Sequence, residues 1–487
     1  MSNAIVASKY YIRRVTKIMK KRRAMAVVMV SVMGLQLAAC GTNSGGQSSD
    51  TGSSKAADAS SEASTDATEE SAEAVTEEKS KDSAVNVVNS DTSGTTVEGS
   101  YTPEEGATIE LFTLKQEVVG VMDNIISEFE KKYPGVTITQ TAVSDAETVL
   151  ATRLAAGDIP DVMQVMPAGK DYQAYYDAGY LMDLTKESFE QNVDPSLLAM
   201  TEYNWIQFCL PETVSTYGIF YRKDIFEKCG ITEAPKTYNE LMDDLKVLQN
   251  AGYERPVAFD FKESAKQITE RVLGAFDPDC NESFAKVASG DMDIQDCKVL
   301  TAYAQFLSDI APYRTEDALG MDRDSALSDI VNGNAVLMFN GSWLLSQFLA
   351  ADPDIELGYC PIPSPLYEGL KVPVNVDTAY AIGADTKYPE ACKAFVDFLS
   401  QTNIATEYYQ VDGNINMIKG VTYDKEQLMD CYDVVMSGNG FVTVGNTWPT
   451  WDLRTDLAAA AQGYVGDEDL DAFLEACKEA IDLYYNE

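Results

Sequence analysis

The sequence contains no histidine, and this absence restricts the chemistry that its other side chains can perform. It excludes Ser-His-Asp and Cys-His nucleophiles, HExxH zinc sites and any metal site that needs an imidazole ligand. Acids, lysines and tyrosines remain as possible catalytic groups. The chain has 77 acidic residues, but no motif distinguishes a pair of carboxylates of the kind that a glycoside hydrolase uses. We therefore expect a protein that binds a ligand without catalysis, with no cofactor and no metal.

Aromatic and amide side chains offer a different chemistry, the recognition of a polar ring. Trp343, in the run MFNGSWLL, follows an apolar strand and opens a helix, and its flat indole suits the C–H face of a pyranose. Asn340 has an amide that both donates to and accepts from hydroxyls. Tyr217 in STYGIFYR and Trp448 in GNTWPTWD offer two more flat faces. Core packing is the alternative for the three aromatic residues, and turn formation is the alternative for Asn340.

Polar residues near predicted strand ends complete the set of candidate ligand contacts. Asp377 in VNVDTAYAIG and Asp260 in VAFDFKES can accept hydrogen bonds from paired sugar hydroxyls, and such charge-assisted bonds are strong. Gln116 and Glu117 follow the first predicted strand, at the end where α/β sheets bind ligands. The alternatives are hinge or capping roles for the two aspartates and helix capping for Glu117.

Alternating strands and helices must position these residues. The predicted strands are ATIELFTL, VTITQT, YGIFYR, AVLMFN and NVDTAYAIG, and the predicted helices include VVGVMDNIISEFEKKYP, YNELMDDLKVLQNAG, DSALSDIVNGN, YPEACKAFVDFLSQ and EDLDAFLEACKEAIDLYY. In the first of these helices Val118, Met122, Ile125 and Phe129 share one face. The alternation predicts an α/β fold with a parallel sheet that has helices on both sides.

The first forty residues read as a targeting segment. Residues 1–39 carry eight basic residues and no acid, and the basic cluster is followed by the apolar run AMAVVMVSVMGLQLAA. This run is short for a membrane span and ends in small residues before Cys40, so Leu37-Ala38-Ala39-Cys40 looks like a bacterial lipobox. We expect cleavage before Cys40 and its acylation, which anchors the chain on the outer face of the membrane. An N-terminal membrane helix is the alternative, and the start codon, Met1 or Met19, stays open.

A low-complexity segment follows the lipobox. Residues 41 to about 105 are rich in Ser, Thr, Ala, Gly and acid, and they contain almost no aromatic side chains. Such a composition buries too little apolar surface to offset the chain entropy lost on folding. We therefore expect residues 40–105 to be an acylated cysteine followed by a disordered tether, and a folded domain over 106–487.

The charge and the cysteines exclude other classes of protein. Without residues 1–39 the chain has 29 basic and 77 acidic residues, a formal charge near −48, so we expect no nucleic-acid partner. Eight further cysteines show no CxxC or zinc-ribbon spacing, and we expect most of them to be unpaired: Cys209, Cys229, Cys280, Cys297, Cys360, Cys392, Cys431 and Cys477.

Several segments, taken in order, resemble a known family. They are GDIPDVMQV, STYGIFYRKDIFEKCGI with APKTYNELMDDLKVL, GNAVLMFNGSW, and AYAIGADTKYPEACKAFVDFL. Together with the lipobox they resemble the extracellular solute-binding proteins of ABC importers, specifically the family-one group that includes maltose-binding protein. The similarity covers nearly all of residues 106–487.

The resemblance implies an α/β fold of the type II periplasmic-binding-protein kind, with two discontinuous lobes and a central ligand cleft. It places lobe 1 at about 106–212 and 374–418, and lobe 2 at about 213–373 and 419–487. In matching family members a tryptophan in the position of Trp343 lies under a sugar ring, and an aromatic residue is often presented near the position of Trp448. The lobes are expected to close on the solute.

The resemblance also implies partners. The expected ligand is a carbohydrate, with an oligosaccharide favoured by the several aromatic candidates, and the expected protein partner is the pair of transmembrane permease subunits. We expect a monomer anchored to the cell membrane through Cys40. A polyamine or an amino-acid derivative is the alternative ligand, and a surface adhesin or sensor that reuses the fold is the alternative function.

Overall fold

The structure, a computed structural model, describes residues 94–167, 170–450 and 452–486. Cys40, the predicted leader and most of the predicted tether lie outside the described residues. The described residues all belong to one compact unit. Among the described residues, no helix has both the length and the apolar character needed to cross a membrane.

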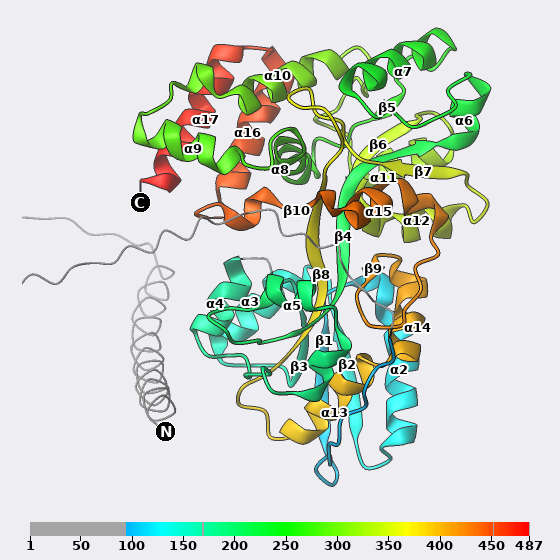
Figure 1. The fold of residues 1–487 in the computed structure, drawn as a ribbon, viewed down its shortest axis with the longest axis vertical. Helices are drawn as coiled ribbons and strands as arrows, with labels where there is room; N and C mark the ends of the chain where they lie inside the picture. The colour runs from blue at the N-terminus through cyan, green and yellow to red at the C-terminus, as the bar shows by residue number, and fades with distance from the viewer. Residues whose placement is uncertain (1–93, 168–169, 451, 487) are drawn as a thin grey trace, which may run out of the picture. The chain divides into compact units, whose positions relative to one another are not determined.

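Ten strands of the described chain form one continuous sheet (Figure 1). Its main order is β2-β1-β3-β8-β4-β6-β5; β10 pairs with β8, and β7 and β9 pair with β4. The strands are β1 (Thr108–Thr113), β2 (Thr137–Ala142), β3 (Val162–Val165), β4 (Leu210–Arg222), β5 (Val257–Ala258), β6 (Leu337–Gly341), β7 (Leu357–Cys360), β8 (Val372–Ile382), β9 (Ile415–Asn416) and β10 (Gly440–Val442).

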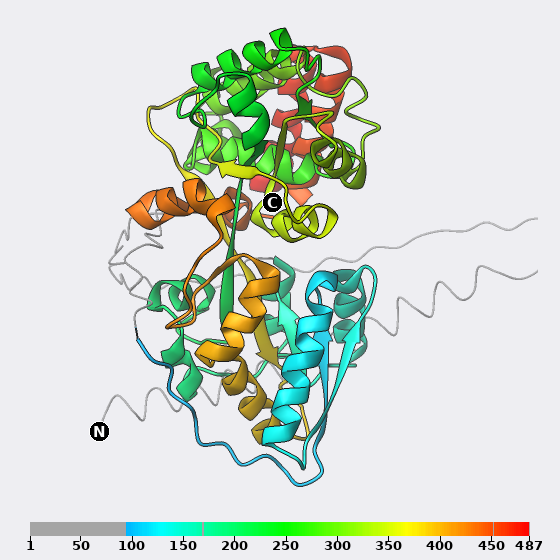
Figure 2. The ribbon, with the colours of Figure 1, turned by 90° about the vertical axis from the view of Figure 1, so that its right-hand side faces the viewer.

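Two groups of helices cover the two ends of this sheet, and β4 and β8 run from one group into the other (Figures 1 and 2). We call lobe 1 the group with β1–β3, whose helices are α2 (Val119–Lys132), α3 (Ala146–Ala156), α4 (Lys170–Asp177), α5 (Pro195–Thr201), α13 (Pro389–Leu399) and α14 (Thr402–Asp412). We call lobe 2 the group with β5–β7, whose helices are α6 (Lys223–Lys228), α7 (Tyr238–Asn250), α8 (Ala265–Phe276), α9 (Cys280–Ser289), α10 (Lys298–Ile310), α11 (Arg323–Val331), α12 (Leu345–Ala351), α15 (Met429–Val434), α16 (Asp452–Asp467) and α17 (Leu470–Tyr485).

The sheet is mixed, whereas strand–helix alternation predicts a parallel one. β1 is parallel to β2 and β3, and β5 is parallel to β6, as expected for strands joined through helices. β8 is antiparallel to both β3 and β4, and β4 is also antiparallel to β6. The reason is that β4 and β8 are the long strands that pass between the lobes in opposite directions, so their pairing must be antiparallel.

Local sequence accounts for the helices as predicted. The apolar face of α2 is fully buried: Val118, Met122, Ile125 and Phe129 each have 0% exposure. α7 begins with a capping box, in which the Thr237 side chain accepts from the Glu240 N–H and the Glu240 carboxylate accepts from the Thr237 N–H. The capping box explains where α7 begins, and both helices lie where the sequence predicts them.

Residues 94–105 are part of the folded structure, whereas the composition predicts that they belong to the disordered tether. Residues 94–105 lie against lobe 1, where the Val97 N–H donates to Asn192 Oδ1 at 2.6 Å and the Gly99 N–H donates to Asp397 Oδ1 at 2.9 Å. The Tyr101 hydroxyl donates to Glu187 Oε2 at 3.0 Å. These few residues pair with side chains from distant parts of the sequence, so their average composition gives no sign of their order.

The eight cysteines of the described residues are all free thiols, and seven of them are buried. Burial raises the pKa of several, for example that of Cys209 to about 12. Such thiols remain protonated and behave as small apolar side chains.

Candidate site between the lobes

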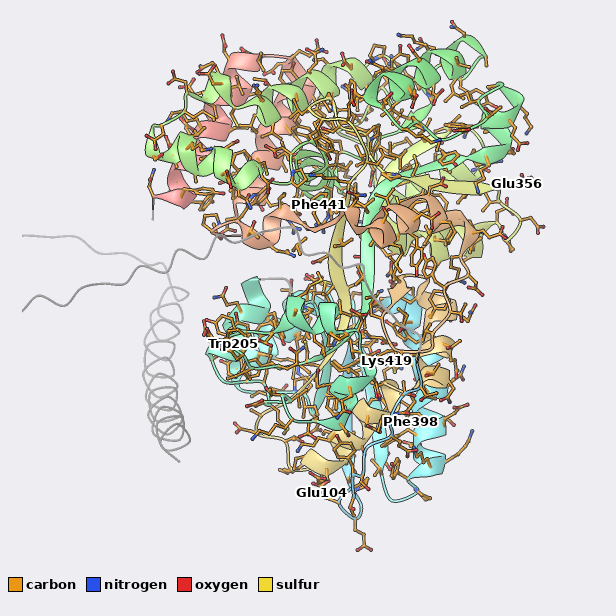
Figure 3. The ribbon with its side chains drawn as sticks, viewed as in Figure 1. Glu104, Trp205, Glu356, Phe398, Lys419 and Phe441 are labelled. Carbon is orange, nitrogen blue, oxygen red and sulfur yellow. The ribbon has the colours of Figure 1, made fainter. Side chains whose placement is uncertain are left out.

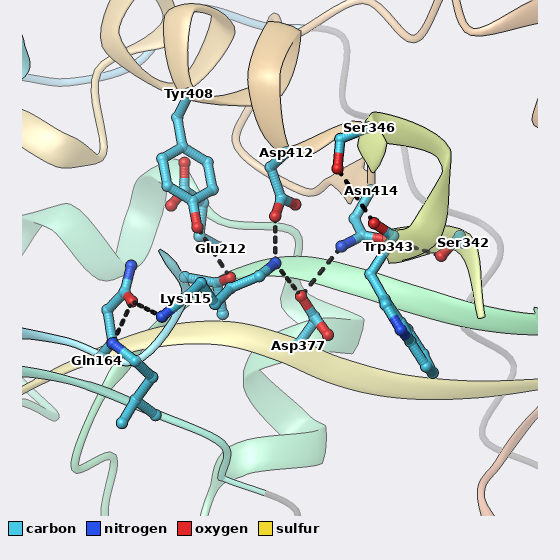
Figure 4. Close-up of polar contacts among 12 residues, drawn as sticks. Lys115, Gln164, Glu212, Ser342, Trp343, Ser346, Asp377, Tyr408, Asp412 and Asn414 are labelled. Atoms are coloured by element: carbon cyan, nitrogen blue, oxygen red, sulfur yellow. Dashed lines mark hydrogen bonds and ion pairs between the residues drawn. The ribbon is translucent and has the colours of Figure 1, made fainter. Parts of the chain in front are cut away.

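A buried lysine lies where the crossing strands meet lobe 1. Lys115 follows β1, and its Nζ lies 2.5 Å from Asp377 Oδ2 on β8 and also contacts Asp412 Oδ1 at the end of α14 (Figure 4). Burial disfavours the charged ammonium, but the carboxylates outweigh this effect and hold the pKa of Lys115 above its ordinary value. Lys115 therefore stays protonated and ties the end of β1 to a crossing strand.

A chain of hydrogen bonds continues from this ion cluster into lobe 2. Asn414 Nδ2 donates to Asp377 Oδ2 at 3.0 Å, and Ser342 Oγ donates to Asn414 Oδ1 at 2.6 Å. The same Ser342 oxygen accepts from the Thr216 N–H on β4 at 3.0 Å. Ser342 opens a short helix, η4 (Ser342–Leu344), at the end of β6. The position of the next residue, Trp343, is thereby fixed relative to Asp377 (Figure 4).

The Trp343 indole lies partly exposed against the backbone of its own turn. Its ring centroid is 6.1 Å from that of Tyr217, at an interplanar angle of 49°. A Cβ atom on Gly341 would lie 1.9 Å from Trp343 Cζ3, so only glycine leaves room for the ring there. The Gly341 backbone itself has φ −89°, which any residue adopts. The glycine is needed for close approach of the ring and not for backbone freedom.

Tyr217 and Asn340 lie beside Trp343 but are buried, at 1% and 2% exposure. The Tyr217 hydroxyl donates to the Phe339 carbonyl at 3.0 Å, and Asn340 Oδ1 accepts from the Gly341 N–H at 2.8 Å. Asn340 Nδ2 has no hydrogen-bond partner among the described residues. The two residues are therefore buried next to Trp343. Asn340 remains a candidate ligand contact because its Nδ2 has no partner within the described residues.

Gln116 and Glu117 lie at the end of β1, as the sequence predicts, and both are exposed. Gln116 Nε2 donates to the Val143 carbonyl at 3.0 Å. Glu117 lines a cavity of 480 Å³ whose other walls are α12 and the end of α14. The structure thus places Glu117 at the junction of the lobes, whereas Gln116 binds the loop that follows β2 in lobe 1.

Trp448 and Asp260 lie inside lobe 2, which corrects the expectation that they face the cleft. Trp448 has 0% exposure and packs near Phe284, with ring centroids 6.2 Å apart. Asp260 also has 0% exposure and accepts from the Ser264 hydroxyl, and burial raises its pKa to about 6. Asp260 therefore holds the hydroxyl of the residue just before α8, and its Oδ1 has no hydrogen-bond partner among the described residues. Trp448 takes the packing alternative, because it belongs to the buried core of lobe 2 and the preceding turn contacts α8 and α9.

A second cavity, of 270 Å³, lies between the lobes beside β8. Its lining includes side chains from both lobes: Tyr172, Tyr176, Tyr203, Val376, Asn446 and Thr447. Asn446 Nδ2 donates to Asn375 Oδ1 at 2.9 Å, and Asn375 shares its face of β8 with Asp377. The sequence analysis did not predict the tyrosines that line this cavity, although the tyrosine-rich runs DYQAYYDAGY and TEYNWI contain them.

Comparison with known proteins assigns the chain to a family. Residues 114–402 match the family described as bacterial extracellular solute-binding protein. The chain belongs to this family. Its members bind solutes and are not enzymes, which agrees with the expectation of a binding protein.

Relatives and solved structures extend the comparison over most of the domain. The chain is 26% identical over 408 residues to the multiple sugar-binding protein of Streptococcus mutans, a match that covers 79% of this chain and 93% of the relative. The structure of RafE in complex with raffinose superposes with a TM-score of 0.70 at 22% identity, over 78% of this chain and all of that one. A chitin oligosaccharide binding protein superposes with a TM-score of 0.67 at 20% identity, over 79% of this chain and all of that one. These superpositions confirm the predicted two-lobed α/β fold.

A buried carboxyl on β4 lies near the ion cluster. Glu212 has 1% exposure, and Asn416 Nδ2 donates to its Oε1 at 3.0 Å. Burial raises the pKa of Glu212 from an ordinary value of 4.5 to about 8. The carboxyl is therefore largely neutral in the folded protein at pH 7, whereas it is ionised in the unfolded chain.

This difference predicts a loss of stability with rising pH. Below pH 4.5 Glu212 is protonated in both states; between pH 4.5 and 8 the unfolded chain alone releases the proton, so the free energy of unfolding falls. Glu212→Gln keeps the acceptor for Asn416 and removes the titration. We expect its advantage over the wild type in free energy of unfolding to be small at pH 5 and to grow up to pH 8, by about 1.4 kcal/mol per pH unit, with a matching rise in its relative melting temperature.

The measurement is thermal unfolding of the two proteins from pH 5 to 9. The exposed Glu105 provides the matched control, because Glu105→Gln removes a carboxyl from the surface of the domain. Parallel curves for Glu212→Gln and the wild type across this range would contradict a neutral Glu212 in the fold.

Proposed function

We propose that this solute-binding protein captures a carbohydrate between its two lobes and delivers it to the transmembrane permease of an ABC importer. The observation that carries the proposal is the partly exposed Trp343 indole, held next to Asp377 where β4 and β8 cross. A flat aromatic face beside a carboxylate and amides suits a ring that has C–H faces and hydroxyl edges.

The relatives support a carbohydrate as the ligand class. The Streptococcus mutans relative is named for several sugars, and the superposed structures are named for raffinose and chitin oligosaccharide. The charge of the chain is the argument for a polyamine, but the Asp377 carboxylate is already paired with Lys115. A cationic ligand would have to displace a buried ammonium, whereas a sugar hydroxyl can share the carboxylate with it.

Lobe closure follows from where the candidate contacts lie. Trp343 belongs to lobe 2, whereas Lys115 and Glu117 belong to lobe 1, and the strands between them are the crossing strands β4 and β8. A ligand that touches both sets gains contacts only when the lobes approach, so it shifts the population towards the closed form. The permease then recognises this closed form.

We predict that an oligosaccharide raises the melting temperature of the purified protein and that Trp343→Ala weakens its binding at least about tenfold, because the aromatic platform is lost. The measurement is a thermal-shift screen followed by calorimetry. The panel contains mono- to tetrasaccharides, including raffinose and stachyose, chitin oligosaccharides, spermidine and amino acids. Trp343→Phe is the matched control and should retain part of the affinity. Stabilisation by spermidine or amino acids alone would contradict the carbohydrate assignment.

We also propose that Cys40 is acylated and holds the protein on the outer face of the cell membrane. The support is the basic n-region, the short apolar run and the small residues that precede Cys40. In a bacterial host that processes lipoproteins, Cys40→Ser should move the protein from the membrane fraction to the soluble fraction and abolish labelling with radioactive palmitate. Unchanged labelling of the Cys40→Ser chain would contradict the anchor.

A further inference from the structure

Residues 94–105 lie along lobe 1 as a segment without helix or strand, and we call this segment the strap (Figure 2). Its first residue lies close to Lys419, because a Cβ atom on Gly94 would lie 3.7 Å from Lys419 Cδ. Figure 3 shows Lys419 on the part of lobe 1 that is nearer to lobe 2, and Glu104 at the opposite end of lobe 1. The strap therefore runs from the level of the lobe junction to the far end of lobe 1, where the chain enters β1.

Buried polar side chains of lobe 1 hold the backbone of the strap. Asn192 is 0% exposed and pairs with both polar groups of one residue: the Val97 N–H donates to its Oδ1 at 2.6 Å, and its Nδ2 donates to the Val97 carbonyl at 2.9 Å. Asp397 is 3% exposed and accepts from the Gly99 N–H at 2.9 Å. A buried amide or carboxylate is costly unless it is hydrogen-bonded. Lobe 1 thus contains a site for an extended backbone, and the strap fills it.

The far end of the strap is held through two of its side chains. The Tyr101 hydroxyl donates to Glu187 Oε2 at 3.0 Å. The Glu104 carboxylate accepts from the backbone N–H groups of Glu390 and Ala391, at 3.1 and 3.0 Å, in the first turn of α13. A carboxylate is stabilising at this end of a helix, so Glu104 and α13 support each other.

Gly99 allows the strap to pass close to lobe 1. A Cβ atom there would lie 2.3 Å from Tyr101 Cε2, 2.4 Å from Ser188 Oγ and 2.8 Å from Asp397 Oδ1. These atoms belong to three different side chains, so the movement of one of them would not make room for a larger residue. Any side chain at this position should therefore weaken the docking of the strap.

The strap is bound to one lobe only. Within the described residues, its hydrogen bonds and its ion pair to other elements all end on lobe 1. A movement of lobe 2 relative to lobe 1 therefore leaves these contacts unchanged. The predicted tether and Cys40 precede the strap in the sequence, so a pull on the tether would act on lobe 1.

We propose that the strap fastens the membrane tether to lobe 1 at the level of the lobe junction, so that lobe 1 alone holds the anchored protein and lobe 2 is free to close on its ligand. The inference rests on the proposed function, because it requires the anchor at Cys40 and a ligand that closes the lobes. It adds how the protein can be anchored without hindering closure.

The first test is cleavage of the purified full chain by a glutamyl endopeptidase, with mass spectrometry of the Glu98–Gly99 bond. Val97→Pro removes the N–H that binds Asn192, and Gly99→Ala places a methyl group against three side chains. We expect both variants to be cut at this bond at least about tenfold faster than the wild type, because cleavage follows the population of the undocked strap.

Two controls accompany the cleavage measurement. Val97→Ala keeps the backbone N–H and should be cut at the wild-type rate, since the Val97 side chain is exposed. Free peptides of residues 94–105 with the same changes correct for the sequence preference of the protease. All three changes lie on the strap itself, so lobe 1 keeps its own sequence in every variant.

The second test is calorimetry with raffinose, stachyose and chitin tetrasaccharide. Because the strap contacts lobe 1 alone, Val97→Pro should bind each saccharide with the wild-type affinity, within about twofold. The acylated full chain in phosphatidylcholine vesicles should likewise match the Cys40→Ser chain in solution.

The outcomes distinguish this inference from the proposed function. Equal cleavage rates of the wild type, Val97→Pro and Gly99→Ala, after the peptide correction, would overturn the docking. An affinity that changes by more than about twofold in Val97→Pro, or on anchoring, would couple the strap or the tether to lobe closure and overturn the independence of lobe 2. If none of the saccharides binds, the proposed function is contradicted, whereas the cleavage rates still decide whether the strap is docked.

Discussion

The antiparallel pairing of β4 with β8 is the constraint on which the rest of the structure depends. The two strands pair from Leu210 with Tyr380 to Thr216 with Val374, and each strand also pairs with other strands of the same continuous sheet. Because this ladder is the part shared by both lobes, residues on it lie beside both of them. Asp377 on β8 and Glu212 on β4 therefore lie where the two lobes join.

The ion cluster and the hydrogen-bond chain connect this ladder to the candidate ligand-binding side chains. Lys115 fixes the end of β1 against Asp377, and Asn414 with Ser342 fixes the turn that carries Trp343. A buried charge is costly to leave unpaired, so these contacts specify one arrangement more than they add stability. The indole is thus presented beside the carboxylate before any ligand arrives, which lowers the ordering cost of binding.

Local patterns in the sequence were sufficient for the elements and the fold, and they located Trp343 and Asp377 at the junction of the lobes. They failed where a property depends on distant packing. The loop around Trp448 looks exposed by composition, but Trp448 is buried in the core of lobe 2, near Phe284 of α9. The partner of Lys115 at the end of α14 is 297 residues away, and the stacking of Tyr176 on Tyr203 has no apolar periodicity to reveal it.

The most direct test of the central claim is the saccharide affinity of Gly341→Ala, measured by calorimetry with the best ligand of the wild type. The new methyl group fits the backbone conformation but overlaps the indole of Trp343, so it displaces the ring without removing it. We predict a loss of affinity close to that of Trp343→Ala with the fold retained. Wild-type affinity in a folded Gly341→Ala protein would contradict the claim that the crossing strands and this turn position Trp343 for the ligand.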